Sequence, residues 1–212
     1  MFKYVMLSAV VAATLFVVAC GGSSNAANTT LGNAQSVQKP QEGAKGAELK
    51  FNQDGSSIGF TGRKVTGKHD GGFDKFSGSL TLDKDNKEVL YAVVEIEMGN
   101  LWTDEKGKSN AKLDGHLKSD DFFAVEKHPR SKFETTKIEK KGDGYEVTGN
   151  LTLRGVTKSL TFPAKISVGE KEVSIKADFK FDRQPFGVSF KGMQDNLIED
   201  QVEVRLDISA KR

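Results

Sequence analysis

Only one cysteine, Cys20, occurs among the 212 residues, so the chain cannot form an intramolecular disulfide. An excess of charge of either sign is also lacking, because 31 Lys and Arg residues stand against 29 Asp and Glu residues, for a net charge of +2. No basic block and no acidic tail interrupts this mixture. Since nucleic-acid binding depends on clustered positive charge, the balance disfavours this function class.

Catalytic motifs are lacking as well. The sequence has no G-x-S-x-G nucleophile elbow, no P-loop and no G-x-G-x-x-G after a strand. His116 and His128 are twelve residues apart, whereas the two histidines of a helical zinc pair are four residues apart. A metal-dependent hydrolase that uses both histidines with Asp121 is therefore the least favoured of the hypotheses for this chain. Asp120 and Asp121 are neighbours in the chain, so their carboxylates do not face each other across a substrate as a catalytic acid–base pair must. The residues by themselves therefore point to no catalytic residue and no metal site, and the absence of motifs leaves enzyme activity open.

The chain begins with an uncharged run of 16 residues, from Tyr4 to Ala19, directly after Lys3. The run is shorter than the roughly 20 residues that span a bilayer as a helix, and its layout is that of a secretory signal. It ends in VVAC, which resembles the lipobox of bacterial lipoproteins, with Val where Leu is commoner. The resemblance implies a signal peptide over residues 1–19 and a palmitate-bearing lipid anchor at Cys20. The alternative is an uncleaved membrane helix.

Residues 21–46 are rich in Gly, Ser, Asn, Ala and Gln and contain no aromatic residue. Such a segment buries too little apolar surface to offset the entropy of ordering it. We therefore predict a flexible tether over residues 20–46, counting Cys20, and one folded domain over 47–212. The expected location is the periplasmic face of a membrane in the bacterial cell envelope, the outer membrane rather than the inner.

Alternation of apolar and polar residues with period two dominates the folded part. It is clearest over residues 73–82, 89–98, 145–153, 160–168, 173–182 and 202–209. Short turn signals separate the runs, which favours antiparallel pairing. A closed sheet would bury every apolar face and remove exposed edges, although a two-sheet sandwich fits the alternation nearly as well. A small barrel is either filled by side chains or holds one ligand, and the alternation leaves both open.

The alternation fails over residues 110–128. Apolar residues between positions 113 and 125 have roughly helical spacing, and Ser119 is placed to N-cap a short helix. Pro129 excludes helical geometry at the residue before it. We predict one or two short helices here, at one end of the barrel.

Four segments of the folded part carry a family resemblance. In order, they are SSIGFTGRKVTGKHDGGFDKFSGSLTL from Ser56, HLKSDDFFAVEKHPRSKF from His116, GNLTLRGVTKSLTFP from Gly149 and FDRQPFGV from Phe181. Together they resemble the YceI-like family of bacterial periplasmic polyisoprenoid-binding proteins, with His128 in the place of the usual Tyr. The resemblance implies an all-β, eight-stranded antiparallel barrel of the lipocalin-like kind, no enzyme activity, and an isoprenoid chain held in the lumen.

The residues expected to line that lumen are apolar side chains of the strands and of a helical flap that would close it. They are Phe60, Phe76, Leu80, Ile96, Phe122, Phe123, Phe133, Leu151, Phe162, Phe179 and Phe186. The expected function is that of a membrane-tethered protein holding a quinone or polyprenyl lipid, for transport, storage or sequestration, with no cofactor besides this lipid. The alternative is a non-catalytic structural or interaction lipoprotein with a filled barrel. The oligomeric state stays open, and a homodimer is among the alternatives.

Overall fold

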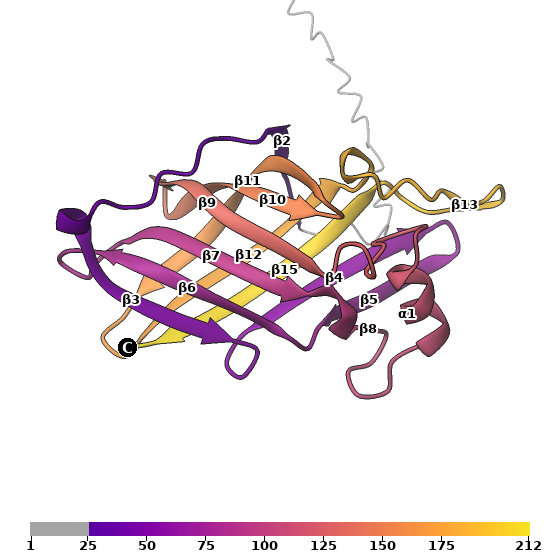
Figure 1. The fold of residues 1–212 in the computed structure, drawn as a ribbon, viewed down its shortest axis with the longest axis horizontal. Helices are drawn as coiled ribbons and strands as arrows, with labels where there is room; N and C mark the ends of the chain where they lie inside the picture. Colours follow the sequence, from indigo (N-terminus) through magenta and orange to yellow (C-terminus); the bar gives the residue numbers. More distant parts are fainter. Residues whose placement is uncertain (1–25) are drawn as a thin grey trace, which may run out of the picture.

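A computed structural model describes residues 26–212 of the chain (Figure 1), and the expected signal peptide and Cys20 lie outside this range. Within it, a thirteen-stranded sheet curls into a half-barrel. Along its main path the strands follow the order β3-β6-β7-β9-β10-β11-β12-β15-β4-β5-β8, and every neighbouring pair is antiparallel. The predicted antiparallel, lipocalin-like architecture is therefore confirmed.

The strands of this path vary from three to thirteen residues in length. They are β3 Lys45–Asn52, β4 Ser57–Lys64, β5 Gly67–Phe73, β6 Phe76–Asp83, β7 Val89–Glu97, β8 Leu101–Thr103, β9 Arg130–Lys141, β10 Gly144–Leu153, β11 Val156–Val168, β12 Glu172–Asp182 and β15 Gln201–Lys211. The described sheet thus has more strands than the eight expected. Glycines in β4 and β5 interrupt the alternation there, and polar side chains of β9 face inward, so these strands left a weak signal in the sequence.

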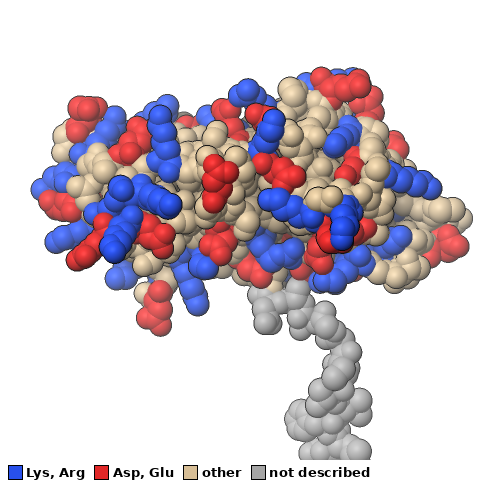
Figure 2. All heavy atoms as spheres, turned by 90° about the horizontal axis from the view of Figure 1, so that it is seen from below, with Lys and Arg blue, Asp and Glu red and all other residues tan. Residues whose placement is uncertain are grey.

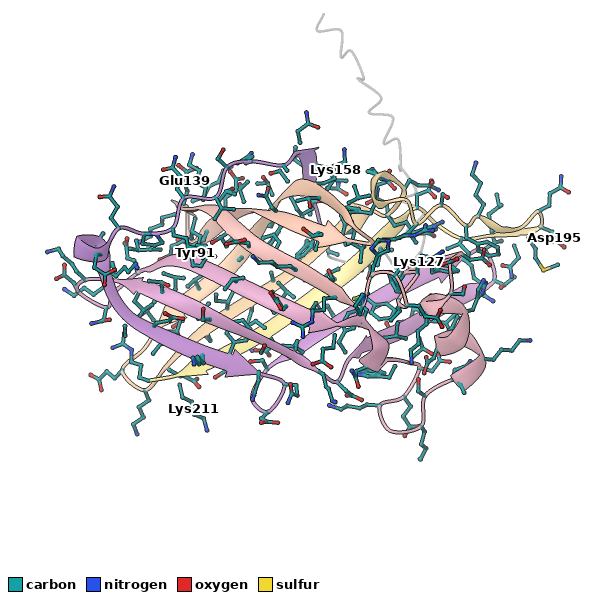
Figure 3. All side chains as sticks on the ribbon, in the orientation of Figure 1. Tyr91, Lys127, Glu139, Lys158, Asp195 and Lys211 are labelled. Carbon is teal, nitrogen blue, oxygen red and sulfur yellow. The ribbon has the colours of Figure 1, made fainter. Side chains whose placement is uncertain are left out.

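Two clusters of buried residues divide the barrel interior along its length. The end where β3 begins and β15 ends is filled by Leu80, Leu82, Val173 and other apolar side chains, and we call it the closed half. The other half holds a second cluster around Phe162, Phe179 and Phe181. This half leads to the end of the barrel where β7, β10 and β12 finish. We call that end the mouth, and this half the mouth half. Outside the barrel, positive and negative side chains are interspersed (Figure 2), and Glu139 and Lys211 point away from the sheet (Figure 3).

The predicted helix is present at the mouth as α1, Ala111–Lys118 (Figure 1). The prediction that Ser119 N-caps a helix is wrong. Asn110 is the N-cap, its side-chain oxygen accepting from the Leu113 N–H at 3.2 Å, whereas the Ser119 N–H donates to the His116 carbonyl at 3.1 Å and ends the helix. Within residues 26–212, no helix is both long and apolar enough to cross a membrane.

The remaining elements are short and lie in the connections. They are β1 Ala27–Asn28, β2 Thr30–Asn33, η1 Glu42–Ala44, η2 Met98–Asn100, η3 Gln184–Phe186, β13 Gly192–Met193 and β14 Asn196–Leu197. The last two pair with each other as a separate hairpin near the mouth.

The flexible tether predicted over residues 20–46 is wrong for the part that the structure describes. β1 pairs with β12, and β2 pairs with β11. The Asn150 side chain then accepts from the Gln35 N–H at 2.9 Å and donates to the Gln35 carbonyl at 2.7 Å. Composition failed here because backbone groups and one amide side chain hold the segment, and neither depends on apolar content.

Candidate functional site

The mouth half of the barrel encloses a cavity of about 190 Å³. Residues of β4, β5, β7, β9, β10, β11, β12 and β15 line it, together with η2, α1, the segment that follows α1 and the loop of residues 183–200. Eight of the eleven residues expected to line a lumen do so: Phe60, Ile96, Phe122, Phe123, Phe133, Leu151, Phe162 and Phe179. Four of these eight, Ile96, Leu151, Phe162 and Phe179, lie in the alternating runs, so period-two alternation identified the inward faces of β7, β10, β11 and β12 correctly.

Three of the expected residues do not reach the cavity, and these predictions are wrong. Phe76 and Leu80 belong to the cluster that fills the closed half. Phe186 is fully buried in η3, where its ring packs edge-on against Phe181 at 5.5 Å between centroids, behind the cavity wall. Alternation tells which face of a strand is inward, but it does not tell how far along the barrel a residue lies.

Other lining residues were missed, mostly aliphatic ones on strands whose alternation was visible. Val202, Val204 and Leu206 lie on the inner face of β15, and Leu160 lies on β11 two residues before the expected Phe162. These residues lie in the alternating runs, so the same signal marks them as inward-facing.

Aromatic rings form one continuous side of the cavity. The rings of Phe162 on β11 and Phe179 on β12 are stacked, with centroids 4.1 Å apart and planes 16° from parallel. Phe133 on β9 lies tilted against Phe162 at 5.6 Å. Such ring pairs contribute packing energy beyond the apolar area they bury, so this side of the cavity is a well-ordered wall.

Few polar side chains lie at the cavity, and most of their polar groups bond elsewhere. The Ser131 hydroxyl donates to the Thr152 carbonyl at 2.8 Å. Arg183 is 3% exposed, and its guanidinium donates to the carbonyls of Glu199 at 3.1 Å and Val188 at 2.6 Å. Burial lowers the pKa of Arg183, although an arginine stays charged in proteins. The third polar lining residue, Glu199, is exposed at the rim.

The segment 111–128 covers the mouth as the predicted flap. The ring of Phe122 contacts His116 and Phe190 at centroid distances of 5.0 Å and 5.5 Å, which joins the flap to the loop of residues 183–200. Arg154 connects the same two segments, because its guanidinium donates to the Asp120 carbonyl at 2.7 Å and also to the Gly187 carbonyl. The flap and the loop are therefore joined to each other, and both contribute residues to the lining of the cavity.

The two histidines of the flap do not make a metal site. His116 Nε2 lies 3.1 Å from Asp121 Oδ2, but the His128 ring lies over Gly155 in the β10–β11 turn. Across residues 26–212, no group of three or more His, Cys, Asp or Glu side chains is placed to hold a metal ion. His116 instead packs edge-on against the rings of Phe122 and Phe190.

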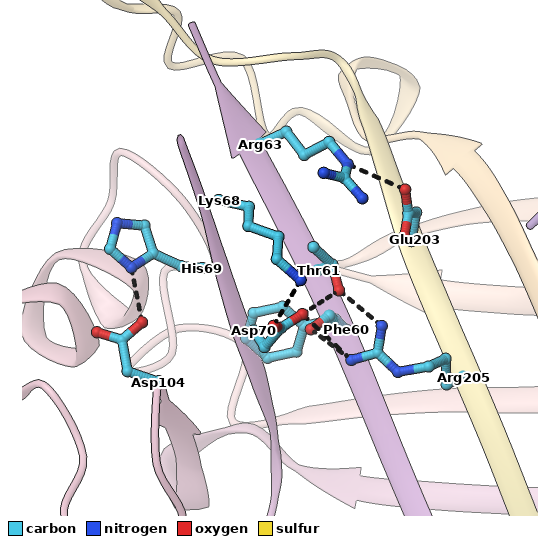
Figure 4. A network of polar contacts seen from close by, with 9 residues as sticks. All are labelled: Phe60, Thr61, Arg63, Lys68, His69, Asp70, Asp104, Glu203 and Arg205. Atoms are coloured by element: carbon cyan, nitrogen blue, oxygen red, sulfur yellow. Dashed lines mark hydrogen bonds and ion pairs between the residues drawn. The ribbon is translucent and has the colours of Figure 1, made fainter. Parts of the chain in front are cut away.

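A polar network on β4, β5 and β15 lies on the outer face of the wall (Figure 4). Thr61, between the lining residues Phe60 and Gly62, donates to Asp70 at 2.5 Å, and Arg205 donates to Thr61 at 2.7 Å. Burial opposes ionisation of Asp70, but hydrogen bonds from Thr61 and Lys68 outweigh it and lower the Asp70 pKa. The network fixes three strands to each other and takes no part in the cavity.

Comparison with known proteins identifies the family. The family description "YceI-like domain" matches residues 49–210. The chain belongs to the YceI-like family. Among curated YceI-like relatives, a UPF0312 protein of Pseudomonas aeruginosa is 41% identical over 96 residues, covering 45% of this chain and 48% of the relative. A UPF0312 protein of Serratia proteamaculans is 35% identical over 125 residues, covering 56% and 62%. The chain spans about half the length of the curated relatives it matches.

Solved structures share the YceI-like fold. The crystal structure of Burkholderia cenocepacia BcnA superposes with a TM-score of 0.65 at 19% identity, over 76% of this chain and 99% of that one. A polyisoprenoid binding domain from Saccharophagus degradans gives a TM-score of 0.58 at 13% identity, over 77% and 98%. At these identities the likeness concerns the fold alone.

Proposed function

We propose that this YceI-like protein binds the hydrocarbon chain of an isoprenoid lipid, a quinone or polyprenyl lipid, in the mouth half of its barrel. The observation that carries the proposal is the cavity lining, which is apolar apart from groups that already have hydrogen-bond partners or lie at the rim. Membership of the family and the shared fold with a polyisoprenoid binding domain support it. The role is binding for transport, storage or sequestration rather than catalysis.

The cavity should recognise the tail of the lipid and not its head. Ser131 and Arg183 donate to backbone carbonyls of the protein, so a buried head group would find few partners there and would lose its bonds to water. We expect the head group to stay near the rim, beside Glu199. Two quinones with different heads and the same long tail should then bind alike, and a quinone without a tail should not bind.

Thermal unfolding in the presence of these three quinones tests the proposal. A ligand present at 100 times its Kd stabilises the folded protein by about 2.7 kcal/mol, which is readily measured as a rise in Tm. The expected result is an equal rise with both long-tailed quinones and none with the tail-less one. An equal rise with all three would show that the head is bound, and no rise with any of them would oppose the proposal.

We also propose that Cys20 carries a lipid anchor at the periplasmic face of the outer membrane. The sequence around Cys20 supports this, and only five residues separate it from Ala26, where the described part of the chain begins. The six Cα–Cα steps from Cys20 to Ala26 span roughly 20 Å at most, so the barrel would stay close to the bilayer. Labelled palmitate should be incorporated into the wild-type chain but not into Cys20→Ala, which should leave the membrane fraction. Incorporation into Cys20→Ala would contradict the anchor.

The alternative of a filled barrel has one observation in its favour, since the closed half is filled by Leu80, Leu82, Val173 and their neighbours. A structural or interaction protein whose barrel is filled throughout would gain no stability from any apolar ligand. The thermal measurement with long-tailed quinones therefore separates the two candidates.

A further inference from the structure

The barrel wall is split between β11 and β12 beside the cavity. The two strands pair with each other only from Lys165 opposite Lys176 to Val168 opposite Val173, in the closed half. Toward the mouth they separate, and residues 27–33, which we call the arm, lie between them. β2 of the arm pairs with residues 158–161 of β11, and β1 pairs with residues 179–180 of β12.

The arm is held less firmly than the strands around it. Its first three residues bond to β12, Thr29 through both its N–H and its hydroxyl to the Lys180 carbonyl, and its last four bond to β11, so at each level it is paired on one side only. By contrast, β12 and β15 pair along their whole length. Leu31 is the arm's apolar contact with the mouth-half cluster. The arm also lies outside residues 49–210, the part of the chain that matches the family.

The outer surface is hollowed beside this split, by a groove that extends over β12 to the neighbouring β15. The groove is lined by Ala27 of the arm, Ala164 of β11 and Ala177 of β12. Leu206 lines both this groove and the cavity. On the inner side, the stacked rings of Phe162 and Phe179 bridge the two separated strands.

Binding a long isoprenoid chain in a cavity of this size would require the wall to move. Its volume of about 190 Å³ is below the roughly 300–1,000 Å³ of typical ligand pockets, and a long isoprenoid chain needs more room than that. We propose that the arm is a lateral gate: its release from β11 and β12 opens the wall, and an apolar chain enters sideways between Phe162 and Phe179. This inference rests on the proposed function. It also places the opening next to the segment that leads to Cys20 and hence to the expected membrane.

A disulfide can lock the gate. A Cβ atom built on Gly32 of the arm lies 3.9 Å from the Cβ of Ser159 on β11, inside the 3.5–4.5 Å range of disulfides. The lock consists of Gly32→Cys together with Ser159→Cys. Both are made in the full chain that carries Cys20→Ser, the parent, so that no other thiol competes for the disulfide. The matched control is Ser167→Cys with Ser174→Cys, which joins β11 directly to β12 in the closed half, where the two strands already pair and the arm is not involved.

The measurement is the rate at which each protein takes up N-phenyl-1-naphthylamine, an apolar fluorescent probe, followed by stopped-flow fluorescence. We expect the oxidised lock to slow uptake at least tenfold with an unchanged final signal, and reduction to restore the rate of the Cys20→Ser parent. The oxidised control should match the parent. Uptake by the oxidised lock at the parent's rate would overturn the gate.

A loosening variant tests the same inference in the opposite direction. Asn150→Ala removes the two hydrogen bonds between its side chain and the backbone of Gln35, just beyond the arm, and among the described residues leaves only the bond from the Thr136 hydroxyl to the Gln35 side chain, so uptake should become several times faster. An unchanged or slower rate would contradict the gate even if the lock fails to fold. Failure of the parent itself to take up the probe would instead reject the proposed function, and the gate with it.

Discussion

Filling the cavity from Gly62 should strengthen the fold and weaken lipid binding at the same time. Gly62 lies on β4 and lines the cavity, on the same face as Ile58 and Phe60. A Cβ atom built on it meets no atom within 4 Å, so a leucine side chain would extend into open space. Few substitutions in a barrel wall add volume without a clash, which makes Gly62→Leu a direct probe of the cavity.

The two expected effects can be estimated from the four carbons that leucine adds. Burying a leucine side chain stabilises a protein by roughly 1.5–3 kcal/mol, and removing a glycine from a strand adds roughly 0.5–1 kcal/mol. The same carbons would displace a similar length of ligand chain, at about 0.8 kcal/mol for each CH2. A loss of about 3 kcal/mol corresponds to roughly a 100-fold rise in Kd, since 1.4 kcal/mol is tenfold.

Urea unfolding gives the stability change, and titration with a long-tailed quinone gives the change in Kd. Gly115→Leu is the matched control, because Gly115 is exposed on α1 and a Cβ there also meets no atom within 4 Å. The control should gain about 1 kcal/mol from helix propensity and bind lipid normally. The reasoning would be refuted if Gly62→Leu bound the quinone as tightly as wild type while its unfolding free energy rose.

Two further predictions concern polar groups of the barrel. Arg183→Lys should destabilise the fold by about 2–4 kcal/mol in urea unfolding, because lysine cannot reproduce the buried bonds to two carbonyls, and an unchanged midpoint would contradict this. Burial opposes ionisation of Glu134, but hydrogen bonds from Lys132 and Tyr91 outweigh it, so its pKa lies below the ordinary 4.5. The stability that ionised Glu134 contributes is therefore complete above about pH 4.5 and declines as the pH falls through the lowered pKa. The difference in urea midpoint between wild type and Glu134→Gln should shrink below pH 4.5, and a constant difference from pH 7 to pH 3 would argue against this role.

Much of the fold could be predicted because most of the long strands show their inward face in the sequence, with β4, β5 and β9 as exceptions. The alternation of Leu160, Phe162 and Ala164 placed them on the buried face of β11, where the structure has them. The helix at the mouth was also predicted, since alternation fails there and helical spacing replaces it.

Depth along the barrel could not be predicted in the same way. Leu80 and Phe162 look alike in the sequence, yet one fills the closed half and the other lines the cavity. This difference depends on which residues lie opposite across the interior, and that is set by the register of distant strands.

The arm and Arg183 escaped prediction for a related reason. Their partners are backbone carbonyls and N–H groups of residues remote in the chain, which leave no pattern of side chains. The prediction of Cys20 as the anchor concerns residues outside the described range, so it stays a prediction, as does the homodimer left open by the sequence.

Mass spectrometry of lipid extracted from the purified protein tests the central claim most directly. The full chain would be produced in a quinone-making bacterium, purified from the membrane fraction in mild detergent, and extracted with organic solvent beside Gly62→Leu. If the cavity binds an isoprenoid lipid, the wild-type extract should contain that lipid in nearly stoichiometric amount, and the Gly62→Leu extract should contain much less. Equal amounts in the two extracts, or no isoprenoid lipid in either, would contradict this claim.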